Sequence, residues 1–215
     1  MLEYIFDGGI MMFPLMFLSV IAFAVIIDRA LAFKAAEKDT RGLRLKVRDS
    51  LEEGKIDEAI NECQTCGGPV AAILMVGLVK FRKLLERGKT LTEIEVNVNK
   101  TMNDYSPHVI DTLEKRIGLL PVIASISPLL GMTGTVTGMI NSFDAMSKSS
   151  ALEATAVSAG ISEALITTAA GLLIAMPAVI AYNIFSKRVD RFILEIEESS
   201  TELIDHITLD YEIEK

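Results

Sequence analysis

Three long segments of the chain carry almost no charged residues, although 23% of all residues are charged. Residues 8–27 and 117–143 contain no charge, and residues 154–186 contain only Glu163. About 20 apolar residues suffice for a helix to cross a hydrocarbon core about 30 Å thick. The sequence therefore predicts an all-α integral membrane protein with three transmembrane helices. The apolar run 69–79 is too short to span and predicts a buried helix of an aqueous part.

Basic residues gather at one end of each apolar segment, and the loop between the second and third spans carries only Lys148. Seven follow the first span between Arg29 and Arg48, Lys115 and Arg116 precede the second, and three follow the third. Because Lys and Arg gather on the cytoplasmic side, the N-terminus is expected outside the cytoplasm and the C-terminus inside. The expected parts are 1–32 (periplasmic N-terminus and first span), 33–116 (cytoplasmic helical domain), 117–186 (hairpin of the second and third spans) and 187–215 (cytoplasmic C-terminal helix). The first span is expected to be retained, since acidic Glu3 and Asp7 precede it.

Apolar residues recur at helical spacing beyond the second and third spans, which predicts long cytoplasmic helical extensions. One stripe leads into the second span without a break: Ile94, Val98, Met102, Tyr105, Val109, Leu113 and Ile117. Thr92 and Glu95 have the spacing of a capping box at its start. A second stripe continues the third span through Phe192, Ile196, Leu203 and Ile207.

Small and hydroxylated residues form one stripe on each of the last two spans. The second span carries Ala124, Pro128, Gly131, Thr135, Gly138 and Ser142, and the third carries Ala164, Thr168, Gly171, Ala175 and Ala178. Small residues let helix backbones approach in a membrane, and hydroxyls find partners across helices. Spacing alone leaves two interpretations open, close helix packing or a permeation pathway.

Glu163 favours the pathway, because a carboxylate inside a bilayer is costly and marks an ion or proton route. Thr167, one turn later, lies on nearly the same face and is placed to hydrogen-bond it. Thr168 points well away from Glu163 on an ideal helix, so the two are expected to face different neighbours. The alternative is that Glu163 lies hydrated at the outer interface.

Composition and motifs exclude several classes of function. A net charge of −8 and a pI near 4.9 argue against a nucleic-acid partner. Cys63 and Cys66 form a single C-x-x-C, whereas a structural zinc site needs four ligands. They are interpreted as reduced thiols in a cytosolic loop, with a redox or intersubunit metal role as the alternative. The chain has no phosphate-binding glycine loop and no nucleophile with a nearby base, so no enzyme, cofactor or metal is expected.

Segments of the second and third spans resemble the ExbB/TolQ/MotA family of ion-driven motor subunits. The matching residues are 130–143 (LGMTGTVTGMINSF), 160–172 (GISEALITTAAGL) and 174–183 (IAMPAVIAYN). Stators of the MotA type carry four spans, so this three-span chain resembles the ExbB and TolQ branch more closely. Thr133 and Thr137 stand where bulkier aromatic residues are common in that branch.

The resemblance implies a bacterial inner-membrane channel subunit that forms a pentamer around single-span partners of the ExbD or TolR type. A protein of the TonB or TolA type would then act at the envelope, in import or in envelope maintenance. In the family a partner aspartate carries the proton. Residues matching Thr135 and Thr168 face it, and the residue matching Glu163 lines the interior. With Thr167, these are the candidate pathway residues.

Two other classes of function compete with the motor. A structural membrane scaffold would use both stripes to pack helices and would conduct nothing. A small-solute transporter is disfavoured by three spans and the lack of an inverted repeat.

Overall fold

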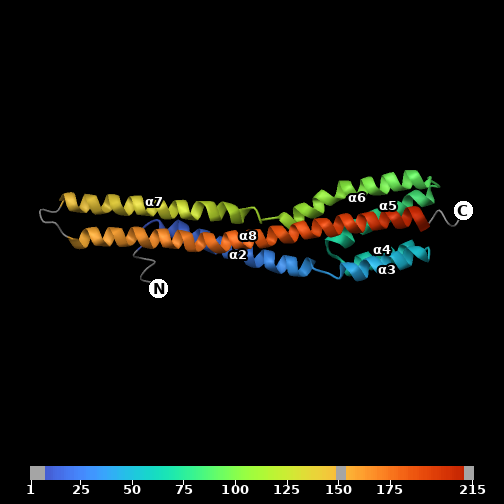
Figure 1. The fold of residues 1–215 in the computed structure, drawn as a ribbon, viewed down its shortest axis with the longest axis horizontal. Coiled ribbons are helices and arrows are strands. Elements are labelled where there is room, and N and C mark those ends of the chain that lie inside the picture. Colours follow the sequence, from blue (N-terminus) through green and yellow to red (C-terminus); the bar gives the residue numbers. More distant parts are fainter. Residues whose placement is uncertain (1–7, 149–153, 211–215) are drawn as a thin grey trace. The chain divides into compact units, whose positions relative to one another are not determined.

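The computed structural model describes residues 8–148 and 154–210, and their regular structure is entirely helical (Figure 1). This confirms the all-α class. The elements are α2 (Met12–Ala36), α3 (Thr40–Glu52), α4 (Ile56–Cys66), α5 (Gly68–Glu86), α6 (Leu91–Glu114), α7 (Leu119–Lys148) and α8 (Ala154–Asp210). Glu3 and Asp7 lie outside the described residues.

The described chain divides into two compact units. One, the membrane unit, contains residues up to Ala30 together with Arg116–Phe185; the other, the polar unit, contains Leu31–Lys115 and the residues from Ser186 onward. Helices α2 and α8 contribute to both units because each runs across a boundary. All of the described candidate pathway residues belong to the membrane unit.

The membrane unit holds the apolar parts of α2, α7 and α8. Within the described residues, three helices are long and apolar enough to cross a membrane, as predicted. Many of their large side chains remain exposed, including Phe13 (69%), Leu129 (60%) and Leu173 (64%). A soluble monomer rarely exposes apolar patches this extensive. These faces therefore require lipid or other protein chains to cover them.

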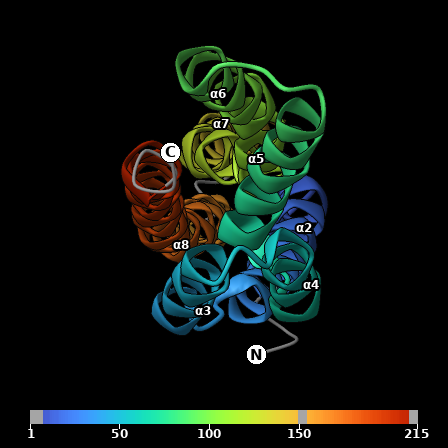
Figure 2. The ribbon, with the colours of Figure 1, turned by 90° about the vertical axis from the view of Figure 1, so that its right-hand side faces the viewer.

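The polar unit is built around one hydrophobic core. Viewed from the end, α5 lies between α6 and the α3–α4 pair (Figure 2). The predicted short apolar run supplies part of this core, since Val70, Ile73, Leu74 and Leu78 of α5 are buried. The continuation of α8 adds Ile196, Leu203 and Ile207. The helical extension of the third span is thus confirmed.

The N-cap of α6 (Thr90) lies two residues earlier than the predicted cap, Thr92. Thr90, in extended conformation, accepts a hydrogen bond from the Glu93 N–H (3.3 Å), and the Glu93 carboxylate accepts one from the Thr90 N–H (3.4 Å). The predicted pair Thr92 and Glu95 was wrong, because both residues lie inside the helix. The sequence contains two overlapping pairs with capping-box spacing. Gly88, at a φ of +63° after α5, turns the chain so that Thr90 is the residue before the first turn.

The predicted single helix from Ile94 to Ile117 is interrupted. Helix α6 ends at Glu114 and α7 begins at Leu119, with a turn between them. Arg116 adopts a φ of +66°, which is uncommon for a residue with a side chain, and its guanidinium pairs with Asp28 of α2 at 3.2 Å. Gly118 follows, and glycine disfavours helix. The helical spacing of apolar residues continues across this turn, although the helix itself ends at Glu114.

Both cysteines lie on α4 rather than in a loop, which corrects the predicted placement. Cys63 is buried in the polar core, and Cys66 is the last residue of the helix and half-buried. Neither is in a disulfide. Cys63 occupies a position that continues the buried face of α4, which explains its burial.

The two thiols should differ sharply in reactivity. Burial, with smaller contributions from Cys66 and Glu62, raises the pKa of the Cys63 thiol to about 12. Because the thiolate is the nucleophile, Cys63 should resist iodoacetamide at pH 8 while Cys66 reacts. Peptide mass spectrometry of the native and the unfolded protein measures this. Cys66→Ala should abolish the native labelling; fast labelling of Cys63 in the folded protein would contradict the described core.

Candidate functional site

Helices α7 and α8 pack against each other through their predicted small stripes. A Cβ atom added at Gly131 would lie 3.0 Å from the Cα of Thr168, and one added at Gly171 would lie 2.5 Å from the carbonyl oxygen of Ser127. Contacts move backward along α8 as they advance along α7, so the helices are antiparallel. Backbone meets backbone at these glycines, which shows that the stripes serve as a packing interface.

The same interface extends toward the loop between the helices. A Cβ atom at Gly138 would lie 2.8 Å from the carbonyl oxygen of Gly160, and Gly160 in turn lies against the hydroxyl of Ser142. Ser142 is buried, and its hydroxyl donates to the Gly138 carbonyl at 2.9 Å. Small residues therefore hold this hairpin together over several turns.

Thr168 lies half-buried within the interface. Its hydroxyl lies 3.0 Å from the Gly131 carbonyl oxygen of α7 and 3.2 Å from the Ala164 carbonyl oxygen of its own helix. Thr135 lies one turn after Gly131, also half-buried, and donates within α7 to the Met132 carbonyl at 2.6 Å. The two predicted residues are thus on neighbouring levels of the hairpin, each held by a backbone carbonyl.

Thr167 is fully buried and connects two segments of the membrane unit. Its hydroxyl lies 2.8 Å from the Gly8 carbonyl oxygen, before α2, and 2.7 Å from the Glu163 carbonyl oxygen. The predicted bond to Glu163 therefore involves the backbone of that residue rather than its carboxylate. A Cβ atom at Gly134 of α7 would lie 2.5 Å from the Thr167 methyl group. Thr167 and Thr168 thus have different neighbours.

The Glu163 carboxylate lies against Gly9, a contact that the sequence did not indicate. Glu163 is half-buried, and a Cβ atom at Gly9 would collide with its Oε1. Gly9 has a φ of +67°, so a residue with a side chain would also be strained there. The available signal was the pair Gly8–Gly9 at the start of an apolar segment. Nothing in the sequence connected it to a residue more than 150 positions away.

The arrangement supplies groups that suit a migrating ion or proton. Glu163 carries a carboxylate that can bind a proton. Each threonine hydroxyl can donate a hydrogen bond to a backbone carbonyl and can accept one from a passing donor. Among the described residues, no three His, Cys, Asp or Glu side chains are grouped as metal ligands would be.

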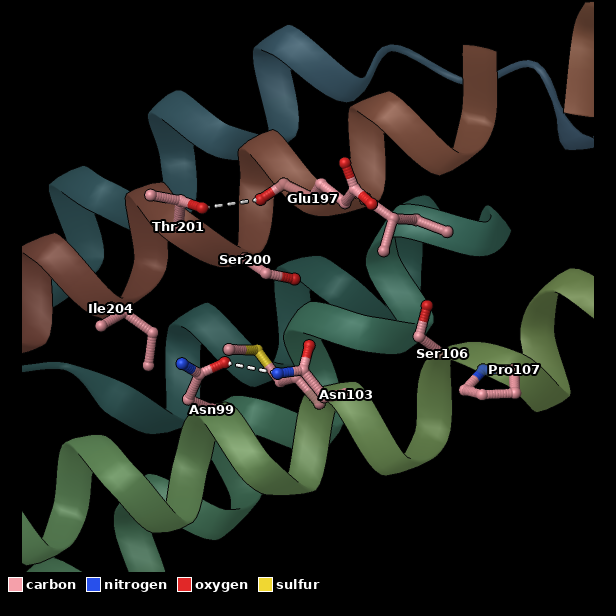
Figure 3. Close-up of a pocket in the computed structure, with 10 residues that line it drawn as sticks. Asn99, Asn103, Ser106, Pro107, Glu197, Ser200, Thr201 and Ile204 are labelled. Carbon is pink, nitrogen blue, oxygen red and sulfur yellow. Dashed lines mark hydrogen bonds between the residues drawn. The ribbon is translucent and has the colours of Figure 1, made fainter. Parts of the chain in front are cut away.

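A pocket of the polar unit, between α6 and α8, contains no comparable chemistry (Figure 3). Its volume is about 370 Å³. Asn103 donates to Asn99 at 2.8 Å, and Thr201 donates to the Glu197 carbonyl at 3.0 Å, so these polar groups are satisfied within their own helices. We interpret it as a gap between helices rather than a reactive site.

Comparison with known proteins bears directly on this hairpin. The family model described as the MotA/TolQ/ExbB proton channel family matches residues 69–198, which include α5, α6, α7 and most of α8. The chain belongs to the MotA/TolQ/ExbB proton channel family. The match contains Thr135, Glu163, Thr167 and Thr168, and it confirms the predicted family.

Individual members of the family resemble the chain over most of its length. The Tol-Pal system protein TolQ of Haemophilus influenzae is 32% identical over 191 residues, which cover 88% of this chain and 82% of that protein. TolQ of Pseudomonas aeruginosa is 30% identical over 185 residues, with 86% and 80% covered. The biopolymer transport protein ExbB of Neisseria meningitidis is 26% identical over 196 residues, with 86% and 87% covered. Family and spans together identify a multi-pass inner-membrane protein of an ion-driven envelope motor.

Proposed function

We propose that this chain is the channel subunit of an inner-membrane motor in which ion passage moves a partner acting at the cell envelope. The observation that carries the proposal is a carboxylate, Glu163, on an apolar helix that also carries the Thr167 and Thr168 hydroxyls, in a proton channel family. An intramembrane ionisable residue is costly and is retained for function. Import of the TonB-dependent kind and envelope maintenance of the Tol kind are the two processes it would energise.

The proposed pathway consists of Thr135, Glu163, Thr167 and Thr168. One charge that crosses 100 mV releases about 2.3 kcal/mol. An interhelical hydrogen bond such as that of Thr168 to Gly131 is worth about 1–2 kcal/mol at most. Each passing charge therefore supplies enough free energy to break and remake such a bond. Helix packing and ion passage can consequently use the same hydroxyl.

The proposed assembly is a pentamer around single-span partners of the ExbD or TolR type, coupled to a protein of the TonB or TolA type. Its support is the family and the apolar faces of α7 and α8. Leu165 and Leu173 are each 64% exposed, and Val136 is 58% exposed. In a bilayer, neighbouring subunits, a partner helix or lipid would cover these faces.

The proposed orientation places the N-terminus in the periplasm and the C-terminus in the cytoplasm. The four parts 1–32, 33–116, 117–186 and 187–215 then alternate between membrane and cytoplasm as the basic flanks indicate. In this orientation Glu163 and the Gly8–Gly9 segment lie toward the periplasmic side, where protons enter.

The scaffold alternative draws support from the glycine contacts between α7 and α8. Replacing the threonines distinguishes a scaffold from a motor subunit. Thr135→Ala and Thr168→Ala should leave assembly intact but abolish the envelope process in a strain that lacks its own copy. As a scaffold, the chain would lose at most about 1–2 kcal/mol of hydrogen bonding, seen only as weaker assembly.

Ser125→Ala is the matched control. Ser125 is an exposed hydroxyl of α7, on the face that carries Leu129 and Met132, and it donates within its helix to Pro121. The control should retain both assembly and function. Threonine variants that assemble and restore the process at wild-type levels would refute the pathway.

A further inference from the structure

A small pocket of the polar unit lies where α2 and α8 leave their apolar segments. Its volume is about 230 Å³. Phe33 and Phe192 lie stacked in its wall, with ring centroids 6.3 Å apart. Four basic side chains also line it: Lys38, Arg41, Arg188 and Arg191. An aromatic wall beside clustered cations suits a ligand that is both anionic and apolar.

Three of these cations differ from most arginines of the chain. Five of the nine arginines form ion pairs: Arg29, Arg44, Arg48, Arg82 and Arg116. Arg41, Arg188 and Arg191 form none with any described residue, although Glu195 lies one turn from Arg191 on α8. Their charge is therefore available to a ligand.

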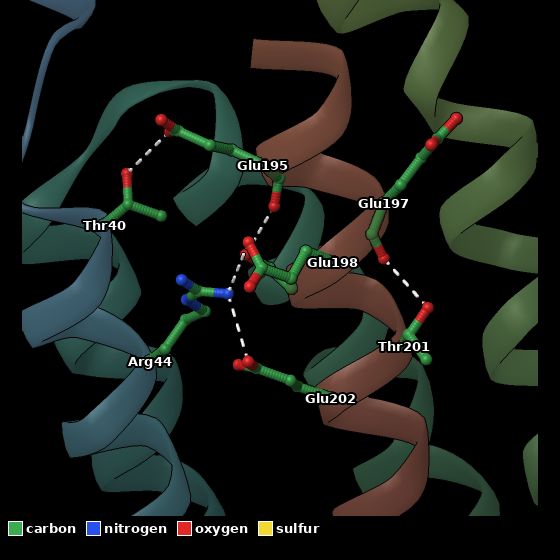
Figure 4. A network of polar contacts seen from close by, with 8 residues as sticks. Thr40, Arg44, Glu195, Glu197, Glu198, Thr201 and Glu202 are labelled. Carbon is green, nitrogen blue, oxygen red and sulfur yellow. Dashed lines mark hydrogen bonds and ion pairs between the residues drawn. The ribbon is translucent and has the colours of Figure 1, made fainter. Parts of the chain in front are cut away.

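Three acidic residues also line the pocket, and two of them accept hydrogen bonds from neutral donors. Asp39 caps α3 by accepting the Gly42 N–H at 3.0 Å. Glu195 accepts the Thr40 hydroxyl at 3.2 Å (Figure 4). Glu37 is the remaining acid, and it is exposed. Four cations against three acids leave the pocket with a formal net charge of +1.

Arg44, on the same helix as Arg41, is ion-paired, whereas Arg41 forms no ion pair within the described part of the chain. Arg44 bridges Glu198 and Glu202 of α8, each at 3.1 Å (Figure 4). Acids on this helix are thus within reach of arginines of α3 where pairing occurs. Arg41, one turn earlier on α3, has no such partner among the described residues, and it lines the pocket instead.

The pocket also lies at the depth of lipid headgroups. The apolar segment of α8 ends at Ser186, and Arg188 and Arg191 follow two and five residues later. At 1.5 Å per residue, they lie roughly 3–8 Å beyond the hydrocarbon edge. Each headgroup layer is about 5–8 Å thick, so this is the level of the phosphates. Leu31, 64% exposed on α2, precedes Phe33 by two residues and follows the first apolar segment, which ends at Ile27.

We propose that this pocket binds the phosphate of an anionic phospholipid, with Arg41, Arg188 and Arg191 as its ligands. A guanidinium presents a fork of N–H donors that matches phosphate oxygens, and the exposed Leu31 offers apolar surface to the adjoining acyl chain. Free phosphate shares this chemistry but lacks the acyl chain. The inference does not depend on ion conduction.

The test compares two triple variants of the full chain in detergent, titrated with phosphatidylglycerol and followed by native mass spectrometry. Arg41→Gln/Arg188→Gln/Arg191→Gln removes the pocket charges and should weaken binding about 100-fold. Lys34→Gln/Lys115→Gln/Lys187→Gln removes equal charge from the same end of the spans, outside the pocket lining. It should bind nearly as wild type does.

Three outcomes would overturn the proposal. Equal weakening in both variants would indicate general attraction to an anionic surface. Unchanged binding in the pocket variant would place the lipid elsewhere. Inorganic phosphate that binds as tightly as the lipid, or displaces it at equal concentration, would assign the pocket to the free ion. Helicity and oligomer mass, expected to be unchanged because the three arginines are at the surface, show that the variants fold.

Discussion

Replacing Gly171 by alanine should destabilise the hairpin of α7 and α8 strongly enough to prevent assembly. The added Cβ atom would lie 2.5 Å from the carbonyl oxygen of Ser127 and 3.3 Å from the Cα of Gly131. Both are backbone atoms, so no side-chain rotation relieves the collision and the helices must separate. Overpacking of this kind costs about 1–3 kcal/mol, and more where backbone must move. Thermal unfolding in detergent and oligomer mass measure the loss.

Gly118→Ala provides the control for this effect. Nothing lies within 4 Å of a Cβ atom added at Gly118, which also belongs to the membrane unit. The substitution should leave stability and oligomer mass unchanged. If Gly171→Ala unfolds at the same temperature as Gly118→Ala, the described contact between α7 and α8 is wrong.

Gly9→Ala should impair the envelope process while the protein still assembles. Its Cβ atom would collide with Oε1 of Glu163, and the flexible carboxylate would turn away to avoid it. The φ of +67° adds strain of about 1–2 kcal/mol. Because the proposed pathway needs Glu163 in place, activity should fall more than stability. Complementation of a deletion strain and oligomer mass measure the two separately.

Gly54→Ala separates backbone strain from the collision with Glu163. Gly54 has a φ of +69°, and nothing lies within 4 Å of an added Cβ atom. It should therefore incur the same strain as Gly9→Ala without moving Glu163. Equal activity in the two variants would show that Gly9 does not position the carboxylate.

The spans were predictable because membrane insertion depends on the summed hydrophobicity of a segment, which the sequence contains directly. The continuation of α8 was predictable for a related reason. Ile196, Leu203 and Ile207 repeat at helical spacing without an intervening glycine or proline, and they are buried. Local pattern and tertiary packing agree along that helix.

The break between α6 and α7 and the contacts of Gly8 and Gly9 were not predictable, because they depend on residues that are distant in the sequence. Arg116 leaves the helical conformation and pairs with Asp28, 88 positions earlier. The contact of Gly9 with Glu163 and the bond of Thr167 to Gly8 likewise join the segment before α2 to the third span, and the second pair is 159 positions apart. A single sequence contains no signal for such pairs. The overlapping capping boxes of α6 were a different difficulty, since local spacing favoured neither.

Helix packing accounts for some residues of the two small stripes but not for all of them. Gly131, Gly138 and Gly171 meet backbone across the interface, as packing requires. Thr135 instead donates within its own helix and makes no described bond to α8, so packing does not account for its hydroxyl. This residue therefore distinguishes a pathway from a scaffold better than Thr168 does.

The most direct test of ion conduction is flux through the assembled complex. The protein, co-purified with the proposed single-span partner, is placed in sealed vesicles that contain a pH-sensitive dye, and an inside-negative potential is imposed. The motor account predicts proton uptake by the wild type, and uptake close to that of empty vesicles for Thr135→Ala/Thr168→Ala. Equal uptake by the two complexes, both fully assembled, would contradict it.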